Sequence, residues 1–191
     1  MKIKSYVAQY EESWLRCRVL AFLHTTYYDD VLQAKPTYEN PSLELVAMKG
    51  DLVVGLLDVE IERVPKEICT FSDHRGAMLW NIAVHPDYRS TGVGIALLRK
   101  AIKTLKEMGI SYLEAWTRDD DWVCDWYRRQ GFEQGVPYLQ VFLEADEIKG
   151  ELKPSYKAIQ TYAHYTGNDI EQKKQEHSRA HICSRFVKEW T

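Results

Sequence analysis

The sequence predicts an α/β fold in which strands and helices alternate along most of the chain. Apolar and acidic residues alternate within 52–63, as they do in a strand with one buried face. After Gly94, apolar residues recur every three or four positions, which is typical of a helix with one buried stripe. Between these segments, the nearly all-apolar run 78–84 indicates a strand buried on both faces.

The remaining elements follow from the same two periodicities. We expect strands over 2–7, 43–48, 52–63, 78–84, 111–117 and 138–143. We expect helices over 11–24, 27–33, 94–108 and 119–130, the last two ended by Gly109 and Gly131.

The segment after Gly150 differs in pattern, and we expect it to form a separate helical part. Apolar residues at helical spacing predict one amphipathic helix that contains Tyr156, Ile159 and Tyr162. A second helix would present Cys183, Phe186, Val187 and Trp190. The chain therefore divides into a domain of residues 1–150 and a helical C-terminal extension of residues 151–191, packed on the core or at a homodimer interface.

The composition is that of a soluble globular protein. Of 191 residues, 45% are hydrophobic and 28% are charged, which is enough to build a sizeable core. The net charge of −3 argues against nucleic acid as a partner. No apolar run reaches about 18 residues and the N-terminus lacks a signal-peptide pattern, so we expect a cytoplasmic protein without membrane contact. The four cysteines lack zinc or C-x-x-C spacing, so we expect reduced thiols and no metal site.

The segment Arg89-Ser90-Thr91-Gly92-Val93-Gly94 lies between the buried strand and the one-sided helix. Its two glycines allow close backbone approach, and the helix that follows offers free N–H groups to a phosphate. The segment lacks the lysine of a Walker A loop, which argues against a nucleotide-binding ATPase. Leu97 stands where a dinucleotide fingerprint needs glycine or alanine.

The segment does fit Arg/Gln-x-x-Gly-x-Gly/Ala after a strand that ends in Val-x-Pro. From Leu79 to Leu98 the chain thereby resembles the GNAT superfamily of acyl-CoA N-acyltransferases. A second match follows at Trp126 to Phe132, which is similar to the aromatic-Tyr-x-x-x-Gly-Phe motif of that superfamily. The resemblance covers residues 2–143. It implies a mixed, mostly antiparallel central sheet with helices on both faces, splayed where the cofactor enters.

The resemblance also implies how acetyl-CoA is held as co-substrate. The backbone amides of the glycine loop would hold the pyrophosphate, and the free edge of the preceding strand would hold pantetheine and polarise the thioester carbonyl. The implied loop residues are Arg89, Ser90, Thr91, Gly92, Val93 and Gly94. The implied strand residues are Ile82, Ala83 and Val84. Asp120 stands where many relatives carry asparagine, and we expect it to accept a hydrogen bond from pantetheine.

Tyr127 matches the residue that serves the superfamily as general acid for the departing thiolate. Many relatives place a glutamate base near the start of the motif strand, where this chain has Met78. Asp58 and Glu60 are the leading candidates for the base, acting through water, with Glu62 beside them. His85 and Asp120 are further candidates for the base, ranked after these three.

The resulting hypothesis is transfer of an acetyl group from acetyl-CoA to a primary amine by direct attack in a ternary complex. The acidic stripe of 52–63 favours a small cationic acceptor. Trp122 and Trp126 would line the acceptor pocket or pack in the core. The alternative is a non-catalytic regulatory or interaction module that binds coenzyme A.

Overall fold

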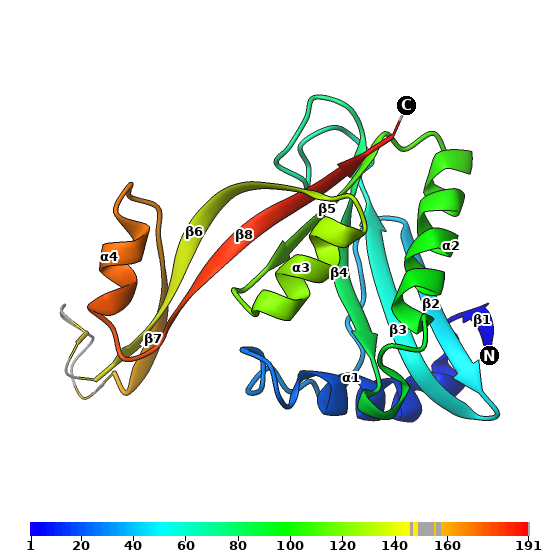
Figure 1. Cartoon of the computed structure of the whole chain (residues 1–191), viewed down its shortest axis with the longest axis horizontal. Helices are drawn as coiled ribbons and strands as arrows, with labels where there is room; N and C mark the ends of the chain where they lie inside the picture. Colours follow the sequence, from blue (N-terminus) through cyan, green and yellow to red (C-terminus); the bar gives the residue numbers. More distant parts are fainter. Residues whose placement is uncertain (146, 149–154, 156–157, 191) are drawn as a thin grey trace.

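The structure is a computed structural model and describes residues 1–145, 147–148, 155 and 158–190 (Figure 1). In the described part, the strands are β1 (Lys2–Ser5), β2 (Ser42–Lys49), β3 (Leu52–Ile61), β4 (Gly76–Val84), β5 (Tyr112–Thr117), β6 (Glu133–Glu144), β7 (Gln160–Tyr165) and β8 (Ala180–Glu189). The α-helices are α1 (Glu11–Phe22), α2 (Val93–Glu107), α3 (Asp121–Arg129) and the short α4 (Ile170–Gln175). Two 3₁₀ helices are η1 (Ala8–Tyr10) and η2 (Pro86–Tyr88).

The strands form one sheet in the order β1-β2-β3-β4-β5-β8-β6-β7. Every neighbouring pair is antiparallel except β4 with β5, which is parallel. The expected mixed, mostly antiparallel sheet is confirmed. Among the described helices, none is long and apolar enough to cross a membrane.

Helices cover both faces of the sheet, as expected. On one face α1 buries Trp14, Cys17 and Ala21 against β3 and β4, because positions three and four apart share one side of a helix. On the other face α2 and α3 pack over a larger apolar core. Gly55 of β3 allows α2 to pack closely against the sheet, since a Cβ at this position would lie 2.5 Å from Val93 Cγ1.

A β-bulge in β4 changes the direction of its side chains. Asp58 of β3 pairs with Asn81, and the next residue, Val59, pairs with Leu79, so Trp80 is the extra residue. Before the bulge, Leu79 faces the core under α2, and after it Ile82 does so instead. The bulge therefore turns Asn81 toward α1.

Beyond the bulge, β4 and β5 separate. Their pairing runs only from Gly76 with Tyr112 to Leu79 with Ala115. The rest of β4 pairs with β3 alone, and its other edge is free of strand pairing. This is the splayed sheet that the family resemblance implies.

The expectation of a helical C-terminal extension is wrong. Cys183, Phe186 and Val187 lie in β8, which is inserted between β5 and β6, and β7 includes Tyr162. The apolar spacing is helical, but β8 is buried on both faces, with Phe186 and Val187 in different core clusters, so a strand here needs no alternation of apolar and polar residues. Tyr156 and the expected boundary at Gly150 lie outside the described residues. The homodimer stays a prediction.

The expected helix at 27–33 is also absent: this part of the loop after α1 forms turns. Arginine side chains take the backbone carbonyls that a helix would use. Arg18 donates to the carbonyl of Asp30 at 2.6 Å, and Arg118 donates to that of Thr26. The loop therefore takes its shape from tertiary contacts.

We predict that a chain truncated at Gly150 does not fold. It lacks β8, which leaves the facing edges of β5 and β6 unpaired and removes the fully buried Phe186. Circular dichroism should show no cooperative thermal transition. A matched variant with residues 144–177 replaced by Asn-Gly should fold, because Val141 and Ala180 are already antiparallel partners that a short turn can join. A cooperative transition in the truncated chain would contradict this prediction.

Candidate functional site

The glycine loop leads into α2 in a form that leaves backbone N–H groups free. Gly92 has φ +84° and Ser90 has φ +59°, so two left-handed residues turn the chain into the helix. The first intrahelical bond runs from the Ala96 amide to the Gly92 carbonyl. No side chain caps α2 and no acidic residue lies in its first turn. The positive end of the helix is thus available to an anion.

Arg89 and the tryptophans of α3 form a wall beside this loop. Arg89 donates to the carbonyl of Ala21 at the end of α1, at 2.6 Å, and its guanidinium lies 5.1 Å from the ring centre of Trp122. Trp122 is half exposed, whereas Trp126 packs beside Gly94. Of the two predicted roles, core packing therefore applies to Trp126, and Trp122 lies at the surface.

The free edge of β4 lies next to the loop. Ile82, Ala83 and Val84 belong to the stretch that pairs with β3 on one side and with no strand on the other. An ideal Cβ on Gly94 would lie 3.5 Å from Val84 and 3.5 Å from Trp126. The predicted cofactor-binding residues of the strand and the loop are therefore brought together.

Tyr127 lies on α3 and is buried against β8. It is 4% exposed, and its ring stacks on Phe186 at 5.0 Å and meets Phe132 edge to face at 5.1 Å. Burial, followed by the nearby Tyr27 and Cys124, raises the pKa of Tyr127 well above its ordinary value. Within the described residues, the Tyr127 hydroxyl has no hydrogen-bond partner. Its proton is therefore not used in a hydrogen bond within the protein.

Asp120 is bonded to the loop after α1, and its contact with pantetheine stays a prediction. Both of its carboxylate oxygens accept from the Thr26 amide, and one also accepts from the Thr26 hydroxyl at 2.7 Å. The carboxylate thus anchors the loop after α1 to the start of α3. Arg179, which precedes β8, pairs with Asp29 of the same loop at 2.8 Å.

The acidic stripe of β3 is buried. Asp58, Glu60 and Glu62 share the sheet face that α1 and the long loops cover, and they are 0%, 7% and 0% exposed. Glu62 accepts from the backbone amides of Cys69 and Gly76 at 2.8 and 2.9 Å, so it fixes the loop between β3 and β4. Glu114 on β5 does the same through the Thr70 amide. These two carboxylates have a structural role.

Asp58 lies in a more polar cluster. The Tyr38 hydroxyl donates to Asp58 Oδ2 at 3.1 Å, and Lys35 Nζ lies 3.5 Å from the same oxygen. Asp58 Oδ1 is buried without a partner among the described residues. Burial raises the pKa of Asp58 to about 6, against the opposing effect of Lys35. Asp58 therefore changes charge near pH 6.

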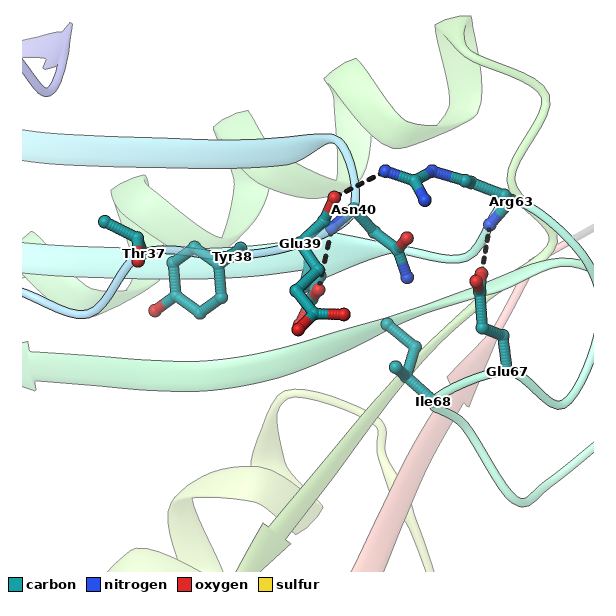
Figure 2. Close-up of a pocket in the computed structure, with 8 residues that line it drawn as sticks. Thr37, Tyr38, Glu39, Asn40, Arg63, Glu67 and Ile68 are labelled. Carbon is teal, nitrogen blue, oxygen red and sulfur yellow. Dashed lines mark hydrogen bonds between the residues drawn. The ribbon is translucent and has the colours of Figure 1, made fainter.

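Glu60 lines a cavity of about 330 Å³ (Figure 2). Its carboxylate accepts from the Trp80 indole at 2.8 Å and from the Asn40 amide at 3.1 Å. In Figure 2, Arg63 reaches across to the Glu39 carbonyl. The other lining residues are Thr37, Tyr38, Glu67 and Ile68. Because Trp80 is the bulge residue, the cavity lies beside the point where β4 leaves β5.

Two residues of this site carry no signal in the sequence. Tyr38 lies in a loop between two prolines, where side-chain periodicity is lost. Trp80 sits in an apolar run that hides its bulge. His85, a lesser candidate base, instead accepts from the Asp87 amide at 3.3 Å.

A profile of the acetyltransferase (GNAT) family matches residues 4–132. This match covers more than half of the chain and includes the glycine loop, the free edge of β4 and Tyr127. The chain belongs to the GNAT acetyltransferase family.

Individual relatives agree with this assignment. Over 63 residues, 32% of this chain, it is 38% identical to a histone acetyltransferase of Glycine max, and the match spans only 26% of that protein. The fold is similar to the ribosomal-protein-S18-alanine N-acetyltransferase from Escherichia coli, with a TM-score of 0.55 at 16% identity, over 97% of this chain and 91% of that one. It is also similar to the PaiA N-acetyltransferase from Thermoplasma acidophilum in complex with coenzyme A, with a TM-score of 0.53 at 13% identity, over 70% and 90% of the two chains.

The different roles of the buried carboxylates predict opposite effects on stability. The folded state raises the pKa of Asp58 from 3.8 to about 6, so its contribution to stability falls as pH rises from about 4 to about 6. Asp58→Asn should therefore raise the free energy of unfolding at pH 7.5, by about 1–3 kcal/mol, and much less at pH 4.5. Urea denaturation at both pH values measures this.

Glu62→Gln is the matched control. Its amide nitrogen cannot accept from the backbone N–H groups that Glu62 now satisfies, so stability should fall by about 1–3 kcal/mol. Equal destabilisation by the two substitutions would contradict the division of roles.

Proposed function

We propose that the chain is an acetyl-CoA-dependent N-acetyltransferase that acts on a small cationic primary amine. The observation that carries this proposal is the separation of β4 from β5, with the glycine loop at one end and the Glu60 cavity beside the bulge. The gap gives a cofactor access to an acceptor on the other side of the sheet. Family membership supports the same reaction.

The cofactor would lie along the loop and the strand edge. Free amides at the start of α2 suit the pyrophosphate. The residues that would hold it run from Arg89 to Gly94, although the Arg89 amide already donates to the Pro86 carbonyl at 3.2 Å. The unpaired edge from Ile82 to Val84 would bond pantetheine and hold an amide donor toward the thioester oxygen. Asp120 would act indirectly, by holding the Thr26 loop beside the gap.

The acceptor amine must lose a proton before it attacks the thioester. For a lysine-like amine with a pKa of about 10.4, this costs roughly 4.6 kcal/mol at pH 7. Glu60 pairs across the strands with Met78, which stands near the point where the family resemblance implies a glutamate. The neighbouring strand thus supplies a carboxylate at nearly the same place. We assign Glu60 to holding the ammonium group, and Asp58 to accepting its proton.

Tyr127 would give its proton to the departing thiolate. Its raised pKa keeps the phenol protonated at neutral pH, and its hydroxyl is free for a ligand. The attack would be direct, within a ternary complex, because the four cysteines are buried and lie outside the motif strand and loop.

The cavity favours a positively charged acceptor of modest size. Glu39, Glu60 and Glu67 line it, against the single cation of Arg63 among the lining residues. The rival function is a regulatory module that binds coenzyme A without turnover. Measuring thiol release from acetyl-CoA distinguishes this module from the enzyme. Release that depends on an added amine supports the enzyme, and binding without release supports the module.

We predict that Gly94→Ala weakens acetyl-CoA binding at least tenfold, measured as Kd by calorimetry. The added methyl group has 3.5 Å of clearance from its protein neighbours, so the fold tolerates it, but it would stand where the pyrophosphate approaches. Alanine is also the better helix former, so the melting temperature should stay equal or rise. An unchanged Kd would mean that the pyrophosphate does not bind at this loop.

We predict that Tyr127→Phe lowers kcat by about a hundredfold or more while the Kd for acetyl-CoA stays nearly constant. The phenyl ring keeps its packing against Phe186 and Phe132, so stability should change little. Rates of thiol release and calorimetric titration measure the two effects. Wild-type turnover in this variant would rule out Tyr127 as the acid.

A further inference from the structure

A chain of hydrogen bonds crosses the sheet face beneath the loop after α1. Arg18 Nε donates to Asn81 Oδ1 at 3.0 Å, and Asn81 Nδ2 lies 3.4 Å from the Tyr38 hydroxyl as its donor. The Tyr38 hydroxyl in turn donates to Asp58 Oδ2 at 3.1 Å. The four side chains come from α1, β4, the loop and β3. They link the bulge of β4 to the buried carboxylate.

Each bond in this chain has a determined direction. A guanidinium can only donate, so the Asn81 oxygen accepts and its amide nitrogen is left to donate toward Tyr38. The phenol has one proton, which it gives to Asp58. All three bridging hydrogens therefore point toward the carboxylate, and the phenol oxygen keeps a second lone pair for another donor.

Asp58 itself cannot touch an acceptor in the cavity, because it is 0% exposed and does not line the cavity. Tyr38 is among the lining residues, and its hydroxyl is bonded to Asp58 and to Asn81, next to the bulge of β4. Among the described residues, Tyr38 is thus the cavity residue that contacts this carboxylate.

We propose that Tyr38 is a catalytic residue that relays the proton of the acceptor ammonium to Asp58. The ammonium nitrogen gives one proton to the Tyr38 oxygen as the Tyr38 proton moves to Asp58 Oδ2. The neutral amine then forms the C–N bond to the acetyl carbon and the C–S bond breaks. Tyr127 gives its proton to the thiolate and recovers one from the attacking nitrogen, which thereby becomes a neutral amide. After product release, the proton on Asp58 returns through Tyr38 to water. This inference rests on the proposed acetyltransferase function.

The charges around Asp58 suit this role. Lys35 Nζ lies 2.5 Å from Glu44 of β2 and 3.5 Å from Asp58. The other titratable groups that face the cluster are Tyr6, near β1, and Arg18 of α1, which acts through Asn81. Burial and Asp58 raise the pKa of Tyr38 far above neutrality, so its oxygen keeps a proton and passes one only by concerted transfer. Because the pKa of Asp58 is about 6, its carboxylate is mostly ionised at pH 7 and can accept a proton.

The test uses the full chain and thiol release from acetyl-CoA, with spermidine, 1,4-diaminobutane and lysine methyl ester as probe amines. The variants are Tyr38→Phe, Asp58→Asn and the double substitution. The control is Tyr6→Phe, which removes a hydroxyl from a ring that also flanks Lys35, at 4.8 Å, and that has no bond to Asp58 among the described residues. Rates are measured from pH 5 to pH 9.

We expect wild-type kcat/KM to fall as the pH drops below about 6, because Asp58 is then protonated. Tyr38→Phe should lower kcat about a hundredfold, leave the KM for acetyl-CoA unchanged and abolish this acidic limb. Asp58→Asn should do the same, and the double variant should lose no more than either single one. Tyr6→Phe should keep the wild-type profile.

Three results would overturn the inference in distinguishable ways. If the wild type is active and Tyr38→Phe keeps its rate and acidic limb, the relay is wrong and the proposed function stands. If the losses of the single variants multiply in the double variant, the two residues act independently and the relay is again wrong. If the folded wild type acetylates none of the probe amines, the proposed function fails and the relay fails with it.

Discussion

The separation of β4 from β5 is the constraint on which the rest of the site depends. Two parallel strands would ordinarily continue their ladder, yet pairing stops at Leu79 and Ala115. The extra residue at Trp80 bends β4, while β5 continues to pair with β8 as far as Thr117. The unpaired strand edge borders the gap that results, and the glycine loop follows at the end of the same strand.

The bulge also decides what the two sides of the sheet can do. It turns Asn81 toward α1, where Arg18 fixes the orientation of its amide, and it leaves the Trp80 indole to bond Glu60. One irregularity thereby joins the strand edge to both the polar cluster of Asp58 and the cavity. The acidic residues of β3 then differ only in their partners. Backbone amides satisfy Glu62, whereas Asp58 keeps an oxygen without a partner among the described residues.

The position of β8 shows how distant segments complete the site. Phe186 stacks on Tyr127 although the two residues are 59 positions apart along the chain. The segment between β6 and β8 reaches back through Arg179 to Asp29, and so supports the loop that also carries Tyr38. Residues outside the matched part of the family profile thus pack on Tyr127 and support the loop that carries Tyr38.

The sequence by itself determined most elements through β5, the glycine loop and the position of Tyr127, because periodicity and motif spacing are local properties of the chain. The tertiary structure alone decided β8, because the helical spacing of Cys183, Phe186 and Val187 conceals a strand that is buried on both faces and paired with β5 and β6. It also decided which groups contact Asp58 and Asp120. A carboxylate has the same chemistry everywhere in a sequence, and only its burial and its donors determine whether it anchors a loop or exchanges a proton.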